Sequence, residues 1–307
     1  MNINTDIKLI TILGPTATGK TNLAVQLAHC INSEIISADS RQIYKNMDIG
    51  TGKDLDEYSV KGLQIPYHLI DILDPNEDYS VYTFQKQFHS IYNDILKQKK
   101  CPILCGGTGL YIESVLLNYE ISSIKPDYDL RHKLDSLSKE ELLIIFKELD
   151  SNTYNNWKCD TKQRIIRGIE IVSKGNLRND IVKYNLSLDD VVVLGMHMER
   201  SLIRAKITDR LTCRLKNGMV EEVESLLSRG IVTFDRLEYF GLEYKYIGMY
   251  LKDEISYEQM FSQLNTAIHK FAKKQMTFFR RMEKRGVKIN WIDNYELDNV
   301  LMTLNSK

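Results

Sequence analysis

Eight residues near the N-terminus have the types and the spacing of a phosphate-binding loop. In order they are Gly14, Pro15, Thr16, Ala17, Thr18, Gly19, Lys20 and Thr21. The run matches the pattern G-x-x-x-x-G-K-[ST] and lies between an apolar strand-like run and a helical pattern, as that loop requires. Glycines let backbone N–H groups surround phosphate oxygens, while Lys20 neutralises a terminal phosphate and the Thr21 hydroxyl binds Mg²⁺. The alternative is a strand–turn–helix that merely contains glycines.

A second group of polar residues follows the next predicted strand. Residues 34–38 have the composition of a short strand, and Asp39, Ser40, Arg41 and Gln42 come directly after it. Side chains just beyond the carboxyl ends of parallel strands face the ligand crevice of an α/β sheet. We therefore expect Asp39 beside the phosphate loop. The alternative role for Asp39 is to cap the next helix.

The elements that must position these residues are those of an α/β fold. Residues 102–105 predict another buried strand, and Gly106, Gly107, Thr108 and Gly109 join it to a further helical pattern. Glycines at such a junction allow a ligand to approach the backbone closely, although a tight turn is the alternative. We predict a P-loop NTPase-like parallel sheet flanked by helices.

The middle of the chain changes character and suggests an insertion. Residues 158–183 contain seven Lys/Arg and three Asp/Glu within helical patterns. We predict a helical insertion at 122–188. The P-loop core domain then comprises 1–121 together with 189–307, including basic C-terminal helices.

One long helix is predicted near the C-terminus, from residue 256 through 285. Its apolar face would carry Ile268, Phe271, Ala272, Phe278, Phe279 and Met282. The broadly opposite face would carry Lys270, Lys273, Lys274, Arg281, Lys284 and Arg285. Residues 269–288 contain eight Lys/Arg and one Glu. This excess favours contact with a phosphate backbone, and the alternative is an ordinary solvated face.

Composition narrows the class of protein. Among the 307 residues, 41 are basic and 41 acidic, which argues against a protein that coats nucleic acid nonspecifically. No apolar run approaches the ~20 residues of a membrane helix, and the first eight residues do not resemble a signal peptide. The five cysteines include no C-x-x-C pair, so neither a disulfide framework nor a zinc site is expected. A cytoplasmic protein without membrane contact is the expectation.

These motifs together resemble the tRNA dimethylallyltransferase (tRNA isopentenyltransferase) family over nearly the whole chain. The matching segments are 14–21, 39–44, 47–51, 68–71, 106–111, 163–167 and 271–277, in the family's order. The chain departs from the family's usual residues at 241–244, where Gly-Leu-Glu-Tyr replaces Gly-Tyr-Lys-Glu, and at Thr212, where an Asp is usual. No Gly-Lys-Pro turn follows 163–167.

The resemblance implies a reaction and a set of roles. A dimethylallyl group would move from dimethylallyl diphosphate to N6 of the adenosine at tRNA position 37, beside the anticodon, and diphosphate would leave. Residues 16–21 would hold the diphosphate with Mg²⁺, and Asp39 would be the base. The tRNA anticodon stem-loop would be contacted by Asp39, Ser40, Arg41, Gln42, Thr108, Arg131, Gln163, Arg164, Ile165, Ile166 and Arg167. A monomer is expected.

General chemistry agrees with that reaction but leaves rivals open. A phosphate loop with Mg²⁺ stabilises a diphosphate leaving group, and a carboxylate that accepts a proton strengthens an exocyclic amine as nucleophile. A base in an RNA loop must be splayed out to reach a buried site. The rivals are a small-molecule kinase that uses ATP, a nucleotide-switched RNA-binding module without catalysis, and a prenyltransferase that acts on free adenine nucleotide.

Overall fold

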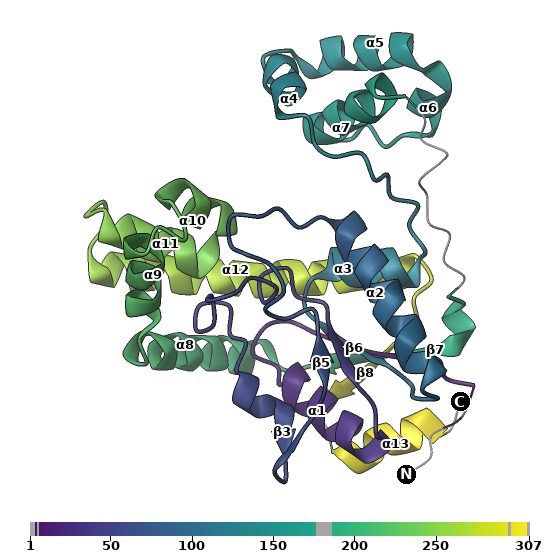
Figure 1. Cartoon of the computed structure of the whole chain (residues 1–307), viewed down its shortest axis with the longest axis vertical. Helices are drawn as coiled ribbons and strands as arrows, with labels where there is room; N and C mark the ends of the chain where they lie inside the picture. The colour runs from purple at the N-terminus through teal and green to yellow at the C-terminus, as the bar shows by residue number, and fades with distance from the viewer. Residues whose placement is uncertain (1–3, 5, 176–185, 294–295, 306–307) are drawn as a thin grey trace. The chain divides into compact units, whose positions relative to one another are not determined.

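The computed structural model describes residue 4 and residues 6–175, 186–293 and 296–305 (Figure 1). The chain forms two compact units. One comprises Met1–Asn118 and Asn185–Lys307, and the other, Tyr119–Tyr184, is inserted into it. The sequence predicts this insertion at 122–188. No helix in the described ranges is both long and apolar enough to cross a membrane.

A six-stranded parallel sheet forms the centre of the larger unit. In spatial order its strands are β5 (Tyr67–His68), β2 (Ile35–Ser37), β6 (Ile103–Gly106), β1 (Leu9–Leu13), β7 (Val191–His197) and β8 (Ile289–Asp293). In the centre, Ile12 of β1 is paired with Cys105 of β6 and with Leu194 of β7. All neighbouring strands are parallel, so the carboxyl ends of β1, β2 and β6 meet at one edge. The predicted α/β class is confirmed.

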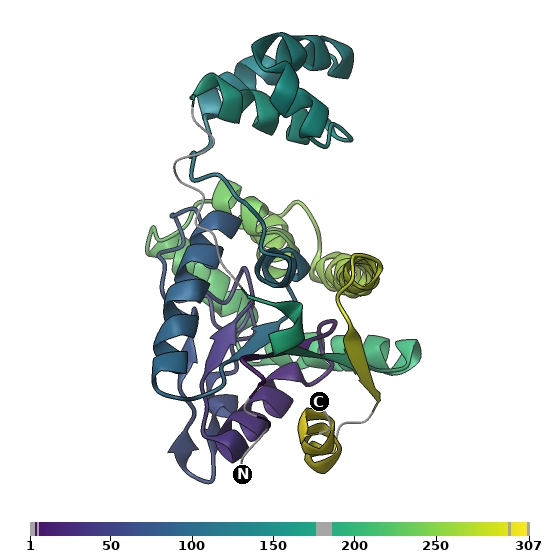
Figure 2. The ribbon, with the colours of Figure 1, turned by 90° about the vertical axis from the view of Figure 1, so that its right-hand side faces the viewer.

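Helices cover both faces of this sheet. Successive side chains of a strand point to opposite faces. Leu9 and Leu13 therefore pack with α2 (Val81–Lys97), α3 (Gly109–Leu116) and the end of α12 (Tyr257–Lys284). Ile10 and Ile12 pack with α1 (Lys20–Ile31) and α13 (Leu297–Asn305) on the other face, and both views show these two helices together (Figures 1 and 2). Because both faces are covered, all five residues of β1 are buried, and four of them are apolar.

A helical layer beside the sheet completes the larger unit. It contains α8 (Arg200–Lys216), α9 (Met219–Ser228), α10 (Phe234–Phe240), α11 (Leu242–Leu251) and the first half of α12. A capping box begins α12, where Ser256 and Gln259 cap each other's backbone N–H groups. Short elements fill the connections: η1 (Leu55–Tyr58), β3 (Ser59–Val60), β4 (Leu63–Gln64) and η2 (Leu188–Asp190).

The inserted unit is a small helical bundle with its own core. Its helices are α4 (Tyr128–Asp135), α5 (Lys139–Leu149), α6 (Ser151–Asn156) and α7 (Lys162–Ser173). Phe146 is fully buried against Ile165 and Ile169. Gly168 allows this contact, because a Cβ there would lie 2.4 Å from the Phe146 ring.

Candidate active site

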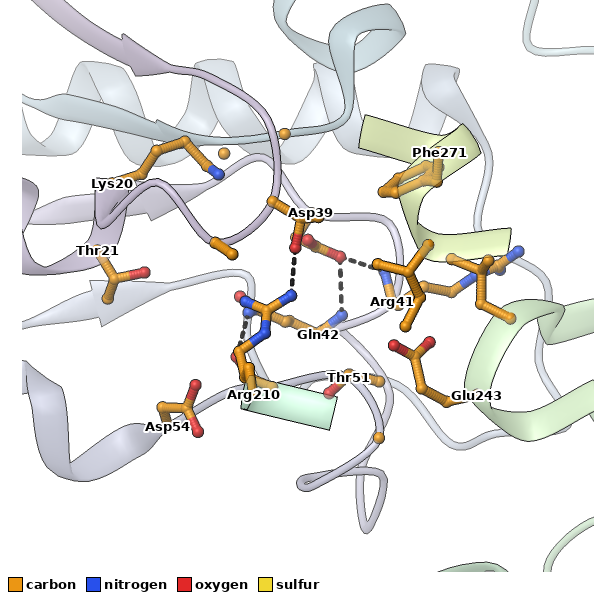
Figure 3. A pocket seen from close by; sticks show the side chains of 18 of the residues that line it. Lys20, Thr21, Asp39, Arg41, Gln42, Thr51, Asp54, Arg210, Glu243 and Phe271 are labelled. Atoms are coloured by element: carbon orange, nitrogen blue, oxygen red, sulfur yellow. Dashed lines mark hydrogen bonds between the residues drawn. The ribbon is translucent and has the colours of Figure 1, made fainter. Parts of the chain in front are cut away.

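A cavity of about 680 Å³ opens at the carboxyl edge of the sheet (Figure 3). Segments that follow β1, β2 and β6 line it, and α8, α11 and α12 close its other sides. Ligand sites of open α/β sheets lie at this edge, as the sequence predicts for this chain. The predicted residues that line it are Thr16, Ala17, Gly19, Lys20, Thr21, Asp39, Ser40, Arg41, Gln42 and Thr108.

The phosphate loop has the backbone geometry that an anion site requires. Ala17 and Gly19 adopt positive φ angles of 65° and 82°. No side chain caps α1, so the first N–H groups of that helix remain available to an anion. Pro15 lies behind the loop and holds it together, because its carbonyl accepts hydrogen bonds from the Thr18 hydroxyl at 2.8 Å and from Lys20 Nζ at 2.7 Å.

Two half-buried cations, Lys20 and Arg210, line the cavity at this loop. Burial lowers the pKa of Lys20 to about 8 and the pKa of Arg210, on α8, to about 10. Arg210 also donates a hydrogen bond to the Thr16 hydroxyl. A cation that has lost part of its hydration gains more from an anionic ligand than an exposed cation does. Sequence reasoning assigns no role to Arg210, because its distance from the loop in the chain gives no signal.

A side chain from α12 fixes the loop from the opposite direction. Gln275 accepts a hydrogen bond from the Thr16 backbone N–H at 2.9 Å and donates one to the Gly107 carbonyl at 3.0 Å. It is nearly buried, at 7% exposure. One amide thus joins the segments after β1 and β6. A Cβ at position 107 would lie 2.4 Å from Gln275 Nε2, so a larger residue there would displace this amide.

Asp39 is held with one oxygen engaged and the other turned away from the turn. Its Oδ1 accepts hydrogen bonds from the backbone N–H groups of Arg41 at 2.8 Å and Gln42 at 3.3 Å. Among the described residues no hydrogen bond reaches Oδ2. The turn is not followed by a helix, since residues 40–43 form turns and then a bridge. Asp39 therefore closes a local turn and caps no helix, so the alternative role is wrong, and its side chain lines the cavity.

Acidic side chains complete the opposite wall. Glu243 of α11 lines the cavity, and burial raises the pKa of its carboxyl group. Asp54 accepts a hydrogen bond from Arg214 Nη2 at 3.0 Å. Glu243 lies in the segment 241–244, where the chain departs from the residues usual in the family that it resembles. The sequence does not predict that this side chain lines the cavity.

The loop 48–54, which walls the cavity, is held by hydrogen bonds to Glu222 and by ion pairs of the buried Lys53. Glu222 accepts the backbone N–H groups of residues 48, 49 and 50, at 2.7–3.1 Å. Lys53 is 1% exposed and pairs with Asp48 and Asp71. Lys53 therefore connects Asp48 to Asp71 and has a structural role. In the same loop, the Gly52 carbonyl accepts a hydrogen bond from Gln42 Nε2 at 2.8 Å.

The predicted tRNA-contacting residues fall into two groups. Ser40 donates its backbone N–H to the Thr108 hydroxyl at 3.0 Å, so the segments after β2 and β6 meet at the cavity. Arg41 lies over the rings of Tyr239 and Phe240, 5.5 and 5.6 Å from their centroids. The remaining residues belong to the inserted unit: Arg131, Gln163, Arg164, Ile165, Ile166 and Arg167.

Within the inserted unit, the predicted tRNA-contacting residues differ in burial and in their ion pairs. Arg131 and Arg167 both pair with the fully buried Glu170, at 2.7 and 2.6 Å. Ile165 and Ile166 are 0% and 6% exposed and belong to the core, so their side chains support the helix rather than offering a surface to RNA. Gln163 and Arg164 are exposed, and Arg164 pairs with Asp160 across one helical turn.

Sequence comparison assigns the chain to a family. It matches the family described as IPP transferase over residues 42–282 and the one described as isopentenyl transferase over residues 7–68. It is 49% identical over 296 residues to "tRNA dimethylallyltransferase 1" of Azobacteroides pseudotrichonymphae, covering 96% of each chain. This chain belongs to the IPP transferase family. A second relative with that name, from Parabacteroides distasonis, is 50% identical and is covered over 92% of its length.

Solved structures of similar proteins share the fold. A tRNA isopentenylpyrophosphate transferase from Bacillus halodurans superposes with a TM-score of 0.68 at 31% identity, covering 97% of this chain and 94% of that one. A eukaryotic dimethylallyltransferase described as acting on tRNA gives a TM-score of 0.76 at 22% identity, with 95% and 75% covered. The second match supports the architecture of this IPP transferase and no more than that.

Proposed function

We propose that this IPP transferase moves a dimethylallyl group from dimethylallyl diphosphate to N6 of adenosine at tRNA position 37. One observation carries the proposal: a phosphate loop with its cations and the Asp39 carboxylate line the same cavity. The loop accounts for a diphosphate, and the carboxylate accounts for a nucleophile that must lose a proton. The relatives named tRNA dimethylallyltransferase supply the expected substrates.

The step balances with the groups that the cavity provides. A bond forms between N6 and the first carbon of the dimethylallyl group, while the bond from that carbon to the diphosphate oxygen breaks. The N6 proton passes to Asp39 Oδ2, since Oδ1 is already engaged by backbone N–H groups. Negative charge grows on the departing diphosphate, where the α1 N-terminus, Lys20 and Arg210 stabilise it.

The donor set fits a magnesium ion that is held mainly by the substrate. No cluster of three or more His, Cys, Asp or Glu suited to a metal occurs in the described part of the chain. The Thr21 hydroxyl lines the cavity beside Lys20 and would supply one ligand, with phosphate oxygens of the substrate and water as the others. When bound, Mg²⁺ adds charge stabilisation for the leaving diphosphate.

The RNA partner of the proposal is the anticodon stem-loop of tRNA. An adenosine must leave its stack to reach a cavity at the sheet edge, and only a loop offers it at low cost. Arg41 and Phe271 lie at the cavity and provide planar or aromatic surface for such a base. Gln163 and Arg164, exposed on α7, are the residues of the inserted unit that we propose as RNA contacts. We further propose a cytoplasmic monomer.

The released product tests this proposal. The purified protein is incubated with Mg²⁺, dimethylallyl diphosphate and an unmodified tRNA transcript, and separately with AMP. We expect diphosphate release and the mass increase of one dimethylallyl group on tRNA alone. A transcript with guanosine at position 37 is the matched control. Transfer to AMP but not to tRNA, or ADP production from ATP with neither substrate prenylated, would overturn the proposal.

A further inference from the structure

Three loops follow β1, β2 and β6 at the cavity, and the last two are joined directly to each other. The Thr108 N–H donates a hydrogen bond to the Ala38 carbonyl at 3.1 Å, and the Ser40 N–H donates one to the Thr108 hydroxyl at 3.0 Å. In the chain, the first contact precedes Asp39 and the second follows it. The loop after β2 is therefore fixed to the loop after β6 on both sides of the Asp39 carboxylate.

The phosphate loop, which follows β1, is joined to the other two loops by a side chain of α12. The Gln275 Oε1 accepts a hydrogen bond from the Thr16 N–H at 2.9 Å, and Nε2 donates one to the Gly107 carbonyl at 3.0 Å. Within the described ranges, no other hydrogen bond joins the phosphate loop to residues 38–42 or 107–109. An amide supplies both an acceptor and a donor, which match these two backbone groups.

The position of Gln275 is set by the buried face of α12. Ala272 and Phe279, about one helical turn before and after it, are buried on the same helix. Phe279 packs in the core that α12 shares with α2 and α3. A polar side chain on such a face is stable only when it is hydrogen-bonded. Core packing thus places the amide, and the amide in turn fixes the phosphate loop relative to Gly107.

We propose that Gln275 is a positioning residue for prenyl transfer: it sets the spacing between the phosphate loop, which binds the diphosphate, and the loop of Asp39, which receives the adenosine. The inference rests on the proposed function. Gln275 does not itself line the cavity, so it acts through Thr16 and Gly107. The attacking nitrogen, the first prenyl carbon and the leaving oxygen must be aligned, and a misplacement of about 1 Å can lower a rate about 100-fold.

The alternative is that this buried amide only stabilises the fold, and the chain contains a glutamine suited to the comparison. Gln85 on α2 is 3% exposed, and its Nε2 donates a hydrogen bond to the Ser114 carbonyl of α3 at 2.9 Å. It lies outside the cavity. Methionine has nearly the length of glutamine, but it has no donor and only a weak acceptor. Gln275→Met and Gln85→Met therefore remove similarly buried amides, one between the loops and one within the core.

Single-turnover transfer to tRNA, at saturating tRNA, dimethylallyl diphosphate and Mg²⁺, measures the positioning. For Gln275→Met we expect a rate about 10- to 100-fold below wild type, with the KM for each substrate changed much less. The reason is that the phosphate loop and the loop of Asp39 can then shift relative to one another while both remain folded. Gln85→Met should melt earlier than wild type to a comparable extent but should keep the wild-type rate.

Gln275→Glu adds a readout that loss of stability alone does not produce. A protonated carboxyl group can accept from the Thr16 N–H and donate to the Gly107 carbonyl, whereas an ionised one can only accept. The charged groups that line the cavity near these loops are present in every variant: Lys20, Arg210 and Asp39. Each rate is therefore compared as a ratio to wild type at the same pH. This ratio should rise for Gln275→Glu as pH falls from about 7.5 to about 5.5, because a buried carboxyl group takes up its proton at a higher pH than an exposed one. For Gln275→Met the ratio should stay constant.

The outcomes separate this inference from the proposed function. If Gln275→Met keeps the wild-type rate, or if both methionine variants lose rate equally, the amide serves stability alone and the positioning role is wrong, while the proposed function stands. If the wild type modifies no tRNA, the proposed function fails and this inference fails with it. Should Gln275→Met melt below the assay temperature, Gln275→Glu decides alone, and a ratio that does not change with pH overturns the positioning role.

Discussion

Replacing Asp39 by asparagine separates proton transfer from every other role of this side chain. Asparagine is nearly isosteric, and its Oδ1 can keep the two hydrogen bonds from the N–H groups of residues 41 and 42. The only group that changes is Oδ2, which becomes an amide nitrogen that cannot take up a proton. The turn after β2 should therefore keep its shape.

The size of the effect follows from that geometry. Loss of a general base typically lowers kcat by about 10²–10⁴-fold, which corresponds to about 2.7–5.5 kcal/mol of transition-state stabilisation. Because both backbone hydrogen bonds survive, the free energy of unfolding should change by less than about 1 kcal/mol. Asp39→Ala is the matched comparison, since it loses the base and also the two hydrogen bonds, at a cost of about 1–2 kcal/mol in stability.

Single-turnover transfer to tRNA is the decisive assay, with Mg²⁺ titrated at saturating tRNA and dimethylallyl diphosphate. For Asp39→Asn we expect a low rate at every Mg²⁺ concentration and an unchanged midpoint of the Mg²⁺ titration. Asp39→Ala should be as slow and should also melt earlier. Restoration of the wild-type rate by excess Mg²⁺ would mean that Asp39 is a metal ligand, and the reasoning from Oδ2 would be refuted.

Three further changes test other parts of the structure. Burial lowers the pKa of Lys20 to about 8, so the free enzyme loses the ammonium charge as pH rises through 8. The KM for dimethylallyl diphosphate should therefore rise above that pH. Lys20→Ala should have a high KM that does not depend on pH in this way. Glu170→Gln should weaken the pairs to Arg131 and Arg167 and destabilise the inserted unit by about 2–3 kcal/mol. Backbone amides of α4 and α7 should then exchange hydrogen faster, while those of the sheet are unaffected. Equal exchange rates in the wild type and the variant would contradict the ion-pair argument. Gln163→Ala, at an exposed position, should raise KM for tRNA more than KM for the diphosphate, and equal effects on both would count against an RNA contact.

Sequence patterns that act over a few residues determined the phosphate loop and the long helix α12. The run Gly14–Thr21 specifies its own structure, because glycine spacing and the adjacent apolar residues act within a few residues of one another. The same is true of much of α12, where the apolar spacing buries Ile268, Ala272, Phe279 and Met282 as predicted. Phe271, predicted on the same face, is instead 38% exposed and lines the cavity. Asp39 is found at the cavity because parallel strands bring their carboxyl ends to one edge.

Tertiary structure alone decided which distant side chains join that loop. Arg210 and Gln275 reach Thr16 from 194 and 259 residues away, and no sequence spacing encodes such a contact. Tertiary structure also decided what two basic residues of α12 contact. Arg281 pairs with the buried carboxylate of Glu113, whereas Lys273 lines a cavity between α8 and α12. Both are basic residues on the same helix, and their roles differ because each role depends on what packs opposite, which only the folded chain defines.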